Sequence, residues 1–235
     1  MFVLGLESAT TVASVAVASE DKILAERMVN NRRTHSVNLL PMIKDTLADA
    51  EISKEQLTGI AVSSGPGSFT GLRIGVSTAR ALAQVLDLPL AGVPTLEVLA
   101  YSLGGQAGLV CPILNARKNE LYAALYRNNL DMQECLIPAQ GISSGNLLAL
   151  LSDFKERIIF TGDGLAEYGE YFKTAPGIDC QLTPVCVSFP RSGAVAELGL
   201  KLFQSGGIFD PFTLLPNYAR ESEAELTWRE RNLRT

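Results

Sequence analysis

The chain has little positive charge and a single histidine. Its 235 residues contain 20 lysines and arginines against 25 aspartates and glutamates, which gives a formal net charge of −5. Proteins that bind nucleic acid on their own usually carry a basic patch or a basic overall balance. We therefore expect that any nucleic acid reaches this chain through a partner that supplies the phosphate contacts.

Several other features are also missing. The four cysteines, Cys111, Cys135, Cys180 and Cys186, show no Cys-x-x-Cys spacing, so we interpret them as buried thiols in a reducing compartment. The amino terminus has no basic start and reaches Glu7 too soon for a secretory signal peptide. No apolar run approaches the roughly 20 residues of a membrane span. We expect a soluble, cytoplasmic protein.

Hydrophobic residues make up 47% of the chain, which is enough for a sizeable core. Apolar periodicity predicts the order strand-strand-strand-helix-strand-helix in the first part of the chain. Pro41 is tolerated in the first turn of a helix, which makes Asn38 the expected N-cap of the first helix. The expected strands cover 2–6, 12–18, 23–29, 60–63 and 90–93, and the helices cover 38–50, 70–86 and 95–103.

The same order is predicted again after a glycine-rich stretch at 104–108. The expected strands cover 109–114, 121–126, 132–137 and 157–161, and the helices cover 146–151, 165–172 and 193–203. Strands that alternate with helices indicate an α/β protein. The repeated order predicts two ribonuclease-H-like halves, the architecture of the actin, Hsp70 and sugar-kinase (ASKHA) superfamily. We expect subdomains at 1–104 and 105–220, followed by a charged tail at 221–235.

The segment 64–75, Ser-Gly-Pro-Gly-Ser-Phe-Thr-Gly-Leu-Arg-Ile-Gly, joins a buried strand to a helix. It is not a P-loop, because no Lys-Ser/Thr pair follows Gly71. Glycines permit positive φ angles, and the free N–H groups of a helix start attract anions. Contact with a phosphate or nucleotide through Gly65, Gly67, Ser68 and Thr70 is one interpretation. A tight turn followed by close helix packing is the other.

The two helices expected at 38–50 and 70–86 carry more apolar or small surface than one side of a sheet should bury. A wide apolar patch on a soluble protein often marks a partner site. Packing between the two halves of the chain is the alternative. The predicted partner-interface residues are Leu39, Leu40, Ile43, Leu47, Leu72, Gly75, Val76, Ala79 and Ala83.

The segment at 65–83, GPGSFTGLRIGVSTARALA, resembles the hallmark stretch of the TsaB (YeaZ) family. Further segments resemble landmarks of the same family, so the resemblance covers the chain from residue 2 to about residue 220. They are Leu4–Thr10, His35-Ser36 with Leu39-Leu40-Pro41, Asn115–Arg117 ahead of Glu120–Tyr122, Gly162–Gly164 and Pro216–Arg220.

The resemblance implies a non-catalytic subunit. Members of this family pair with TsaD, which transfers threonylcarbamoyl from threonylcarbamoyl-AMP to N6 of the adenosine next to the anticodon, position 37, in tRNAs that read codons beginning with A. The resemblance also implies a small ATPase partner, TsaE, a homodimer when the chain is alone, and tRNA contact only through the complex. No cofactor is expected in the isolated chain, and ATP or ADP is expected only at a subunit junction.

Two departures from the family pattern and one difference from TsaD bear on catalysis. Glu7 stands where the family usually has Asp, which in related kinases helps to hold magnesium and phosphate, and Asn115 stands where many members have Asp. Glu7 is either a remnant of such a site or a hydrogen-bonded or solvated turn residue. TsaD binds a metal through His-x-x-x-His, but here the fourth residue after His35 is Leu39. We expect no catalytic and no metal-binding residue, and interpret His35 as a helix-start or interface residue.

Two other functions stay open at this point. One is an enzyme of the same fold, either a nucleotide-binding phosphotransferase or a metallopeptidase, although Glu7, Asn115 and the missing second histidine supply its ligands poorly. The other is a nucleotide-binding regulator without turnover, which is compatible with the scaffold role.

Overall fold

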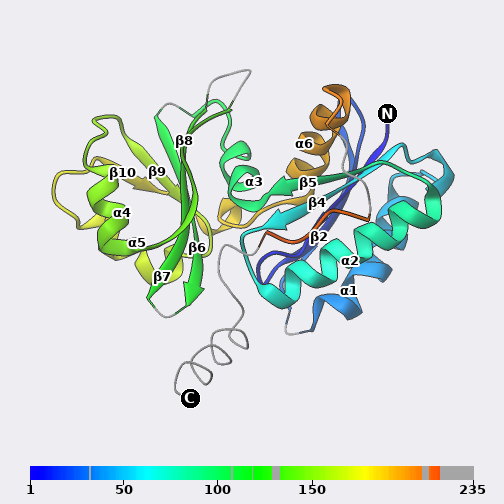
Figure 1. Ribbon diagram of the computed structural model, residues 1–235, viewed down its shortest axis with the longest axis horizontal. Coiled ribbons are helices and arrows are strands. Elements are labelled where there is room, and N and C mark those ends of the chain that lie inside the picture. Colours follow the sequence, from blue (N-terminus) through cyan, green and yellow to red (C-terminus); the bar gives the residue numbers. More distant parts are fainter. Residues whose placement is uncertain (32, 107, 118, 129–132, 208–211, 218–235) are drawn as a thin grey trace, which may run out of the picture.

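The computed structural model describes the chain except for residues 32, 107, 118, 129–132, 208–211 and 218–235 (Figure 1). It contains two five-stranded mixed sheets with helices on their faces. The charged tail expected at 221–235 and the end of the Pro216–Arg220 landmark lie outside the described residues. None of the described helices is long and apolar enough to cross a membrane.

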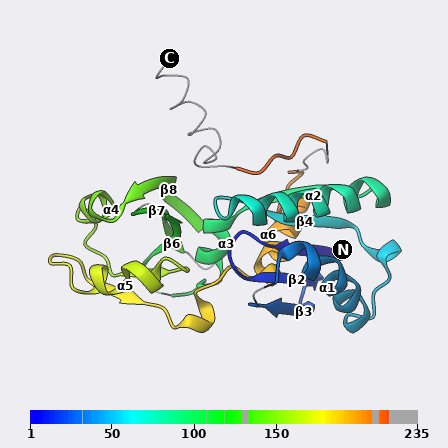
Figure 2. The same cartoon turned by 90° about the horizontal axis from the view of Figure 1, so that it is seen from below.

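The first sheet has the strand order β3-β2-β1-β4-β5. Strand β1 pairs antiparallel with β2 and parallel with β4, so its buried apolar residues sit at the centre of the sheet. Helices α1 and α2 lie side by side over one face (Figures 1 and 2). The elements are β1 (Val3–Glu7), β2 (Ala13–Ala18), β3 (Ile23–Val29), α1 (His35–Asp49), η1 (Lys54–Gln56), β4 (Gly59–Gly65), α2 (Phe69–Leu86) and β5 (Leu90–Pro94).

The second sheet repeats this arrangement with the order β10-β9-β6-β7-β8. Its central strand β6 is antiparallel to β7 and parallel to β9, as β1 is to β2 and β4. Helices α4 and α5 pack against it around Phe160 and Phe172, whose rings are stacked 4.5 Å apart. The elements are β6 (Leu109–Arg117), β7 (Glu120–Asn128), β8 (Gln133–Ser143), α4 (Ser144–Leu151), β9 (Ile158–Thr161), α5 (Leu165–Lys173), β10 (Cys180–Leu182) and η2 (Val185–Val187).

The last helix of each half packs on the sheet of the other half. Helix α3 (Thr95–Tyr101) follows the first sheet, but its Leu96 and Leu99 join the apolar cluster of the second sheet. Helix α6 (Ser192–Gln204) follows the second sheet, but its Val195 and Ala196 join Val3 of the first. The two helices therefore connect the lobes (Figure 1).

The predicted fold class, two ribonuclease-H-like halves of an actin-like α/β protein, is confirmed. The expected boundary at residue 104 separates the two sheets along the chain, while α6 returns to the first of them. Sequence periodicity did not indicate β10, which has only three residues.

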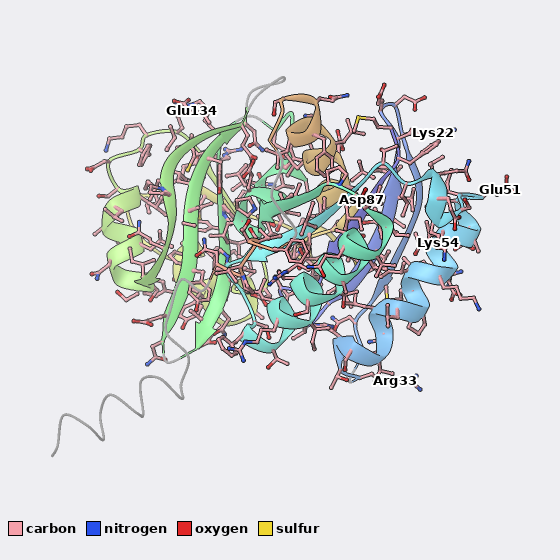
Figure 3. All side chains as sticks on the ribbon, turned by 45° about the vertical axis from the view of Figure 1, so that its right-hand side comes forward. Lys22, Arg33, Glu51, Lys54, Asp87 and Glu134 are labelled. Atoms are coloured by element: carbon pink, nitrogen blue, oxygen red, sulfur yellow. The ribbon has the colours of Figure 1, made fainter. Side chains whose placement is uncertain are left out.

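The predicted start of the first helix is wrong. Helix α1 begins at His35 with Thr34 as N-cap, so Asn38 and Pro41 lie inside it. Proline removes one backbone donor within a helix. Burial of Leu39 and Met42 against the sheet outweighs that loss, and the exposed Pro41 ring points away from the core. Figure 3 shows Arg33 at the beginning of α1, and Glu51 and Lys54 beyond its end.

The four cysteines are free thiols, but only one is buried. Burial raises the pKa of the Cys111 thiol in β6, whereas Cys135 and Cys186 are exposed and Cys180 is half-buried. The expectation that all four are buried is therefore wrong, because β8 lies at a sheet edge and Cys186 lies in the short helix η2.

The change Gly199→Ala tests the packing of α6. Alanine normally stabilises a helix relative to glycine by about 1 kcal/mol. A Cβ at position 199 would overlap the Ala61 side chain in β4, so we expect a loss of about 1–3 kcal/mol in the free energy of unfolding, measured in urea. The control is Gly145→Ala in α4, where the nearest atom lies 3.9 Å away. Equal effects of the two changes would contradict this packing.

Candidate functional site

Glu7 lies at the carboxyl end of β1 and is completely buried. The backbone N–H of Ala9 donates to its Oε1 at 2.5 Å, and the Ser63 hydroxyl of the neighbouring strand β4 donates to its Oε2. Burial raises the pKa of Glu7 from 4.5 to about 7, although these hydrogen bonds act in the opposite direction. Of the two interpretations of Glu7, the structure supports a hydrogen-bonded turn residue.

Hydrogen bonds to residues 8, 9 and 10 fix the turn that follows Glu7. The Ser8 hydroxyl donates to the backbone oxygen of Gly71 at 2.9 Å, and the Ser68 N–H donates to the backbone oxygen of Ala9 at 2.7 Å. The His35 Nε2 lies 2.8 Å from the backbone oxygen of Thr10, so the lone histidine ties the first residue of α1 to the turn. The turn and both helix starts form one hydrogen-bonded unit.

Gly71, Gly75, Ala79 and Ala83 form a buried stripe of small residues on α2, and its first two members contact the same turn. A Cβ at Gly71 would overlap the backbone oxygen of Ser8, and a Cβ at Gly75 would overlap the Ser8 hydroxyl. These glycines therefore allow α2 to approach the turn closely. The stripe packs within this chain.

Polar groups in and beside the loop from Gly65 to Thr70 form hydrogen bonds within this chain. Gly65 has a φ of 116°, which favours glycine, and it lies against Asn217, whose N–H donates to the Ser64 oxygen at 2.6 Å. Ser68 caps α2 by accepting from the Gly71 N–H at 3.3 Å. The Ser68 and Thr70 side chains remain exposed and are the groups of this loop that a nucleotide could contact.

The equivalent position in the second half is Asn115, near the carboxyl end of β6. Its backbone N–H donates to Asp163 Oδ1 at 3.0 Å, and its Nδ2 donates to Glu167 Oε2 at 2.5 Å. Burial raises the pKa of the Asp163 carboxyl. Asp163 and Glu167 thus accept from a neutral amide. No group of three or more His, Cys, Asp or Glu in the described part of the chain could hold a metal ion.

Two members of this site were not predicted. Ser63 was assigned to a buried strand without a role, and Asp163 was quoted only as a landmark. The parallel pairing of β1 with β4, and of β6 with β9, brings each of them to the end of the central strand. Only the strand order places Ser63 and Asp163 at these positions, and the strand order cannot be read from a single sequence.

Most of the predicted interface residues are buried within this chain. The exceptions are Leu40, with 58% of its surface exposed, and Leu47, which is half-buried. The others face the first sheet because each helix needs its whole apolar stripe to cover that sheet. The buried ones are Leu39, Ile43, Leu72, Gly75, Val76, Ala79 and Ala83.

A different set of apolar side chains is exposed on the same two helices. Val37 and Leu40 lie on α1 with 55% and 58% exposure, and Val85 lies on α2 with 82%. Pro41 and Ala81 are also exposed and share helix faces with them. We call these five residues the α1–α2 outer face. Of the predicted interface residues, only Leu40 belongs to this outer face.

The fold and the site define the chain as a two-lobed protein of the actin and sugar-kinase class. Its strand-end residue Glu7 is hydrogen-bonded within the chain. A family model described as "TsaD: tRNA N6-adenosine threonylcarbamoyltransferase" matches residues 22–228. The Bacillus subtilis (strain 168) "tRNA threonylcarbamoyladenosine biosynthesis protein TsaB" is 30% identical over 230 residues, which cover 98% of this chain and 99% of that protein. The chain belongs to the TsaB family.

Further relatives agree. The Escherichia coli (strain K12) protein of the same name is 34% identical over 131 residues, which cover 55% of this chain and 56% of that protein. The solved structure of "YeaZ from Pseudomonas aeruginosa" is 25% identical with a TM-score of 0.76, covering 92% of this chain and 99% of that chain. Component A of the Acidaminococcus fermentans (R)-2-hydroxyglutaryl-CoA dehydratase, at 10% identity and a TM-score of 0.51, shares the fold alone, over 86% of this chain and 98% of that one.

The change Glu7→Gln tests the burial of this carboxyl. Because the pKa of Glu7 is raised in the folded state, the folded protein keeps a proton that the unfolded chain loses between pH 4.5 and about 7. The free energy of unfolding should therefore fall, by up to about 3 kcal/mol, as the pH rises through this window. The neutral variant should lack this part of the pH dependence.

Urea unfolding at pH 5, 6, 7 and 8 measures how the free energy of unfolding depends on pH. Glu170→Gln, at a side chain that is 82% exposed, is the matched control and should keep the slope of the unchanged protein. A Glu7→Gln variant with the same slope as the control would show that Glu7 ionises freely.

Proposed function

We propose that this chain is a non-catalytic scaffold subunit in the formation of threonylcarbamoyladenosine on tRNA. In this role it binds TsaD and supports transfer of threonylcarbamoyl from threonylcarbamoyl-AMP to N6 of adenosine 37. The names of the TsaB relatives and the TsaD family model support a place in this pathway. The burial of Glu7 is the observation that supports a non-catalytic role.

A kinase-like or ATP-hydrolysing site of this fold needs acidic side chains that can reach a magnesium ion from both lobes. Both oxygens of Glu7 accept hydrogen bonds from its own turn and from Ser63, and its surroundings favour the neutral carboxyl. The second lobe offers the neutral amide of Asn115 at the equivalent place. These contacts support a chain that assists catalysis elsewhere.

The α1–α2 outer face is the proposed surface for TsaD and for a second copy of this chain. Val37 and Leu40 are exposed near the start of α1, and Val85 is exposed near the end of the neighbouring helix α2. Burying three such side chains against a partner contributes on the order of several kcal/mol before the cost of association. Because both partners would use the same area, we propose that homodimer and heterodimer exclude each other.

Two further contacts belong to the proposal. The net charge of −5 supports tRNA binding through TsaD rather than directly. The exposed hydroxyls of Ser68 and Thr70 at the start of α2 are the groups that would contact ATP or ADP at a subunit junction, which TsaE would join in the larger assembly.

The changes Leu40→Asp and Val85→Asp test the interface. A buried, unpaired carboxylate at the contact should weaken the TsaD complex at least tenfold, because desolvating the charge is unfavourable. Size-exclusion chromatography with light scattering, on this chain mixed with TsaD from the same organism, measures it. Circular dichroism should remain unchanged, since both side chains are exposed.

The matched control is Val185→Asp in η2 of the second half, where the side chain is 76% exposed. It should leave the heterodimer intact. If Val85→Asp and Val185→Asp behave alike, the interface lies elsewhere. If no complex forms in any nucleotide condition while the chain alone hydrolyses ATP, the scaffold role itself is wrong.

A further inference from the structure

A cleft of about 1080 Å³ lies between α3 and α6, separate from the Glu7 and Asn115 positions. The edge strand β5, helix α6 and the ends of β7 and β8 line it, so both lobes contribute. Its volume is at the upper end of the range for small-molecule sites. Its apolar lining includes Val93, Pro94, Val187, Leu198 and Leu202.

Most charged side chains of this cleft already have partners. Glu26 accepts from the Arg191 guanidinium and from the Gly193 N–H. Glu197 accepts from the Tyr101 hydroxyl at 2.5 Å, and the Lys201 Nζ lies 2.8 Å from the same hydroxyl and 4.6 Å from the centre of its ring. Arg191 is therefore paired with Glu26, whereas Lys201 contacts the hydroxyl and the ring of Tyr101 and has no carboxylate partner among the described residues.

Glu97, in the first turn of α3, is different. Within the described ranges no residue donates a hydrogen bond or ion pair to its carboxylate, and burial raises its pKa. The negative charge of Glu97 also contributes to raising the pKa of Cys135 in β8 and of Tyr126 in β7. Its carboxyl therefore lies on the side of the cleft formed by those strands. A carboxyl group with no hydrogen-bond or ion-pair partner among the described residues thus lines a largely apolar cleft.

A second unsatisfied acceptor lies in the same wall. Gln133 Nε2 donates to Asn128 Oδ1 at 3.0 Å, and Asn128 Nδ2 donates to the Ala100 oxygen of α3 at 2.7 Å. This chain of bonds leaves Gln133 Oε1 buried with no donor among the described residues. Unpaired buried acceptors cost free energy, and a ligand that brings N–H donors would remove that cost.

We infer that this cleft binds a small organic cation, a primary amine or guanidine on an apolar body, with its charged group on Glu97. The apolar walls would enclose the body, and Gln133 Oε1 would accept a second N–H after a small movement of its side chain. An anionic ligand is disfavoured at this position because it would meet the carboxyl of Glu97, and Arg191 is already paired with Glu26. This site is independent of the α1–α2 outer face.

Tryptamine, with tryptophol and indole-3-propionate as its neutral and anionic counterparts, tests the charge preference. Titration of the isotope-labelled full chain by NMR should show tryptamine binding at least tenfold more tightly than either counterpart. The amides of Gly104, Gly105 and Gly193, which line the cleft, should be among those that shift. Equal affinities for the three ligands, or shifts confined to other residues, would overturn the inference.

Variants separate the charge from the cavity. Glu97→Gln should reduce tryptamine affinity at least tenfold, to the level of tryptophol, while Glu170→Gln on α5 should leave it unchanged. Ala194→Phe, which adds a large side chain to the lining of the cleft and keeps Glu97, should weaken all binding at the site. Unchanged tryptamine affinity in either Glu97→Gln or Ala194→Phe would contradict the assignment.

Discussion

The exchange of α3 and α6 between the two sheets is the constraint on which the rest of the structure depends. Each sheet has two apolar faces. Helices α1 and α2 cover one face of the first sheet, and α4 and α5 cover one face of the second. The other face is covered by a helix from the opposite half: Ala196 of α6 packs near Gly5 in β1, and Leu96 of α3 packs in the second cluster. Neither half can bury its sheet alone, so the lobes are held at a defined angle with a cleft between them.

The contacts at the strand ends support the proposed scaffold role. The ends of β1 and β6, where an enzyme of this class places its cation ligands, are occupied by hydrogen bonds inside the chain. Glu7 holds its own turn, and Asn115 binds Asp163 and Glu167. The outer face of α1 and α2 and the cleft between α3 and α6 are both accessible.

The sequence predicted the element order and the duplicated fold because strand and helix periodicities are local properties. It could not predict which side of α1 and α2 is free, because an apolar stripe looks the same whether it packs on its own sheet or on a partner; Leu39 and Val76 are buried, while Val37 and Val85 are not. The contact of Glu7 with Ser63 and the common wall of Glu97 and Gln133 depend on strand pairing and helix exchange. Those are long-range features that spacing in one sequence does not contain.

The most direct test of the central claim is the rate of threonylcarbamoyl transfer to tRNA by the reconstituted complex with the Glu7→Gln variant. Incorporation of labelled threonine would be followed with TsaD and its partners present, at matched heterodimer concentration. A scaffold whose Glu7 carboxyl only holds a turn predicts a rate within about twofold of the unchanged protein. A fall of a hundredfold or more with the heterodimer intact would show that Glu7 takes part in the chemistry, and would contradict the account.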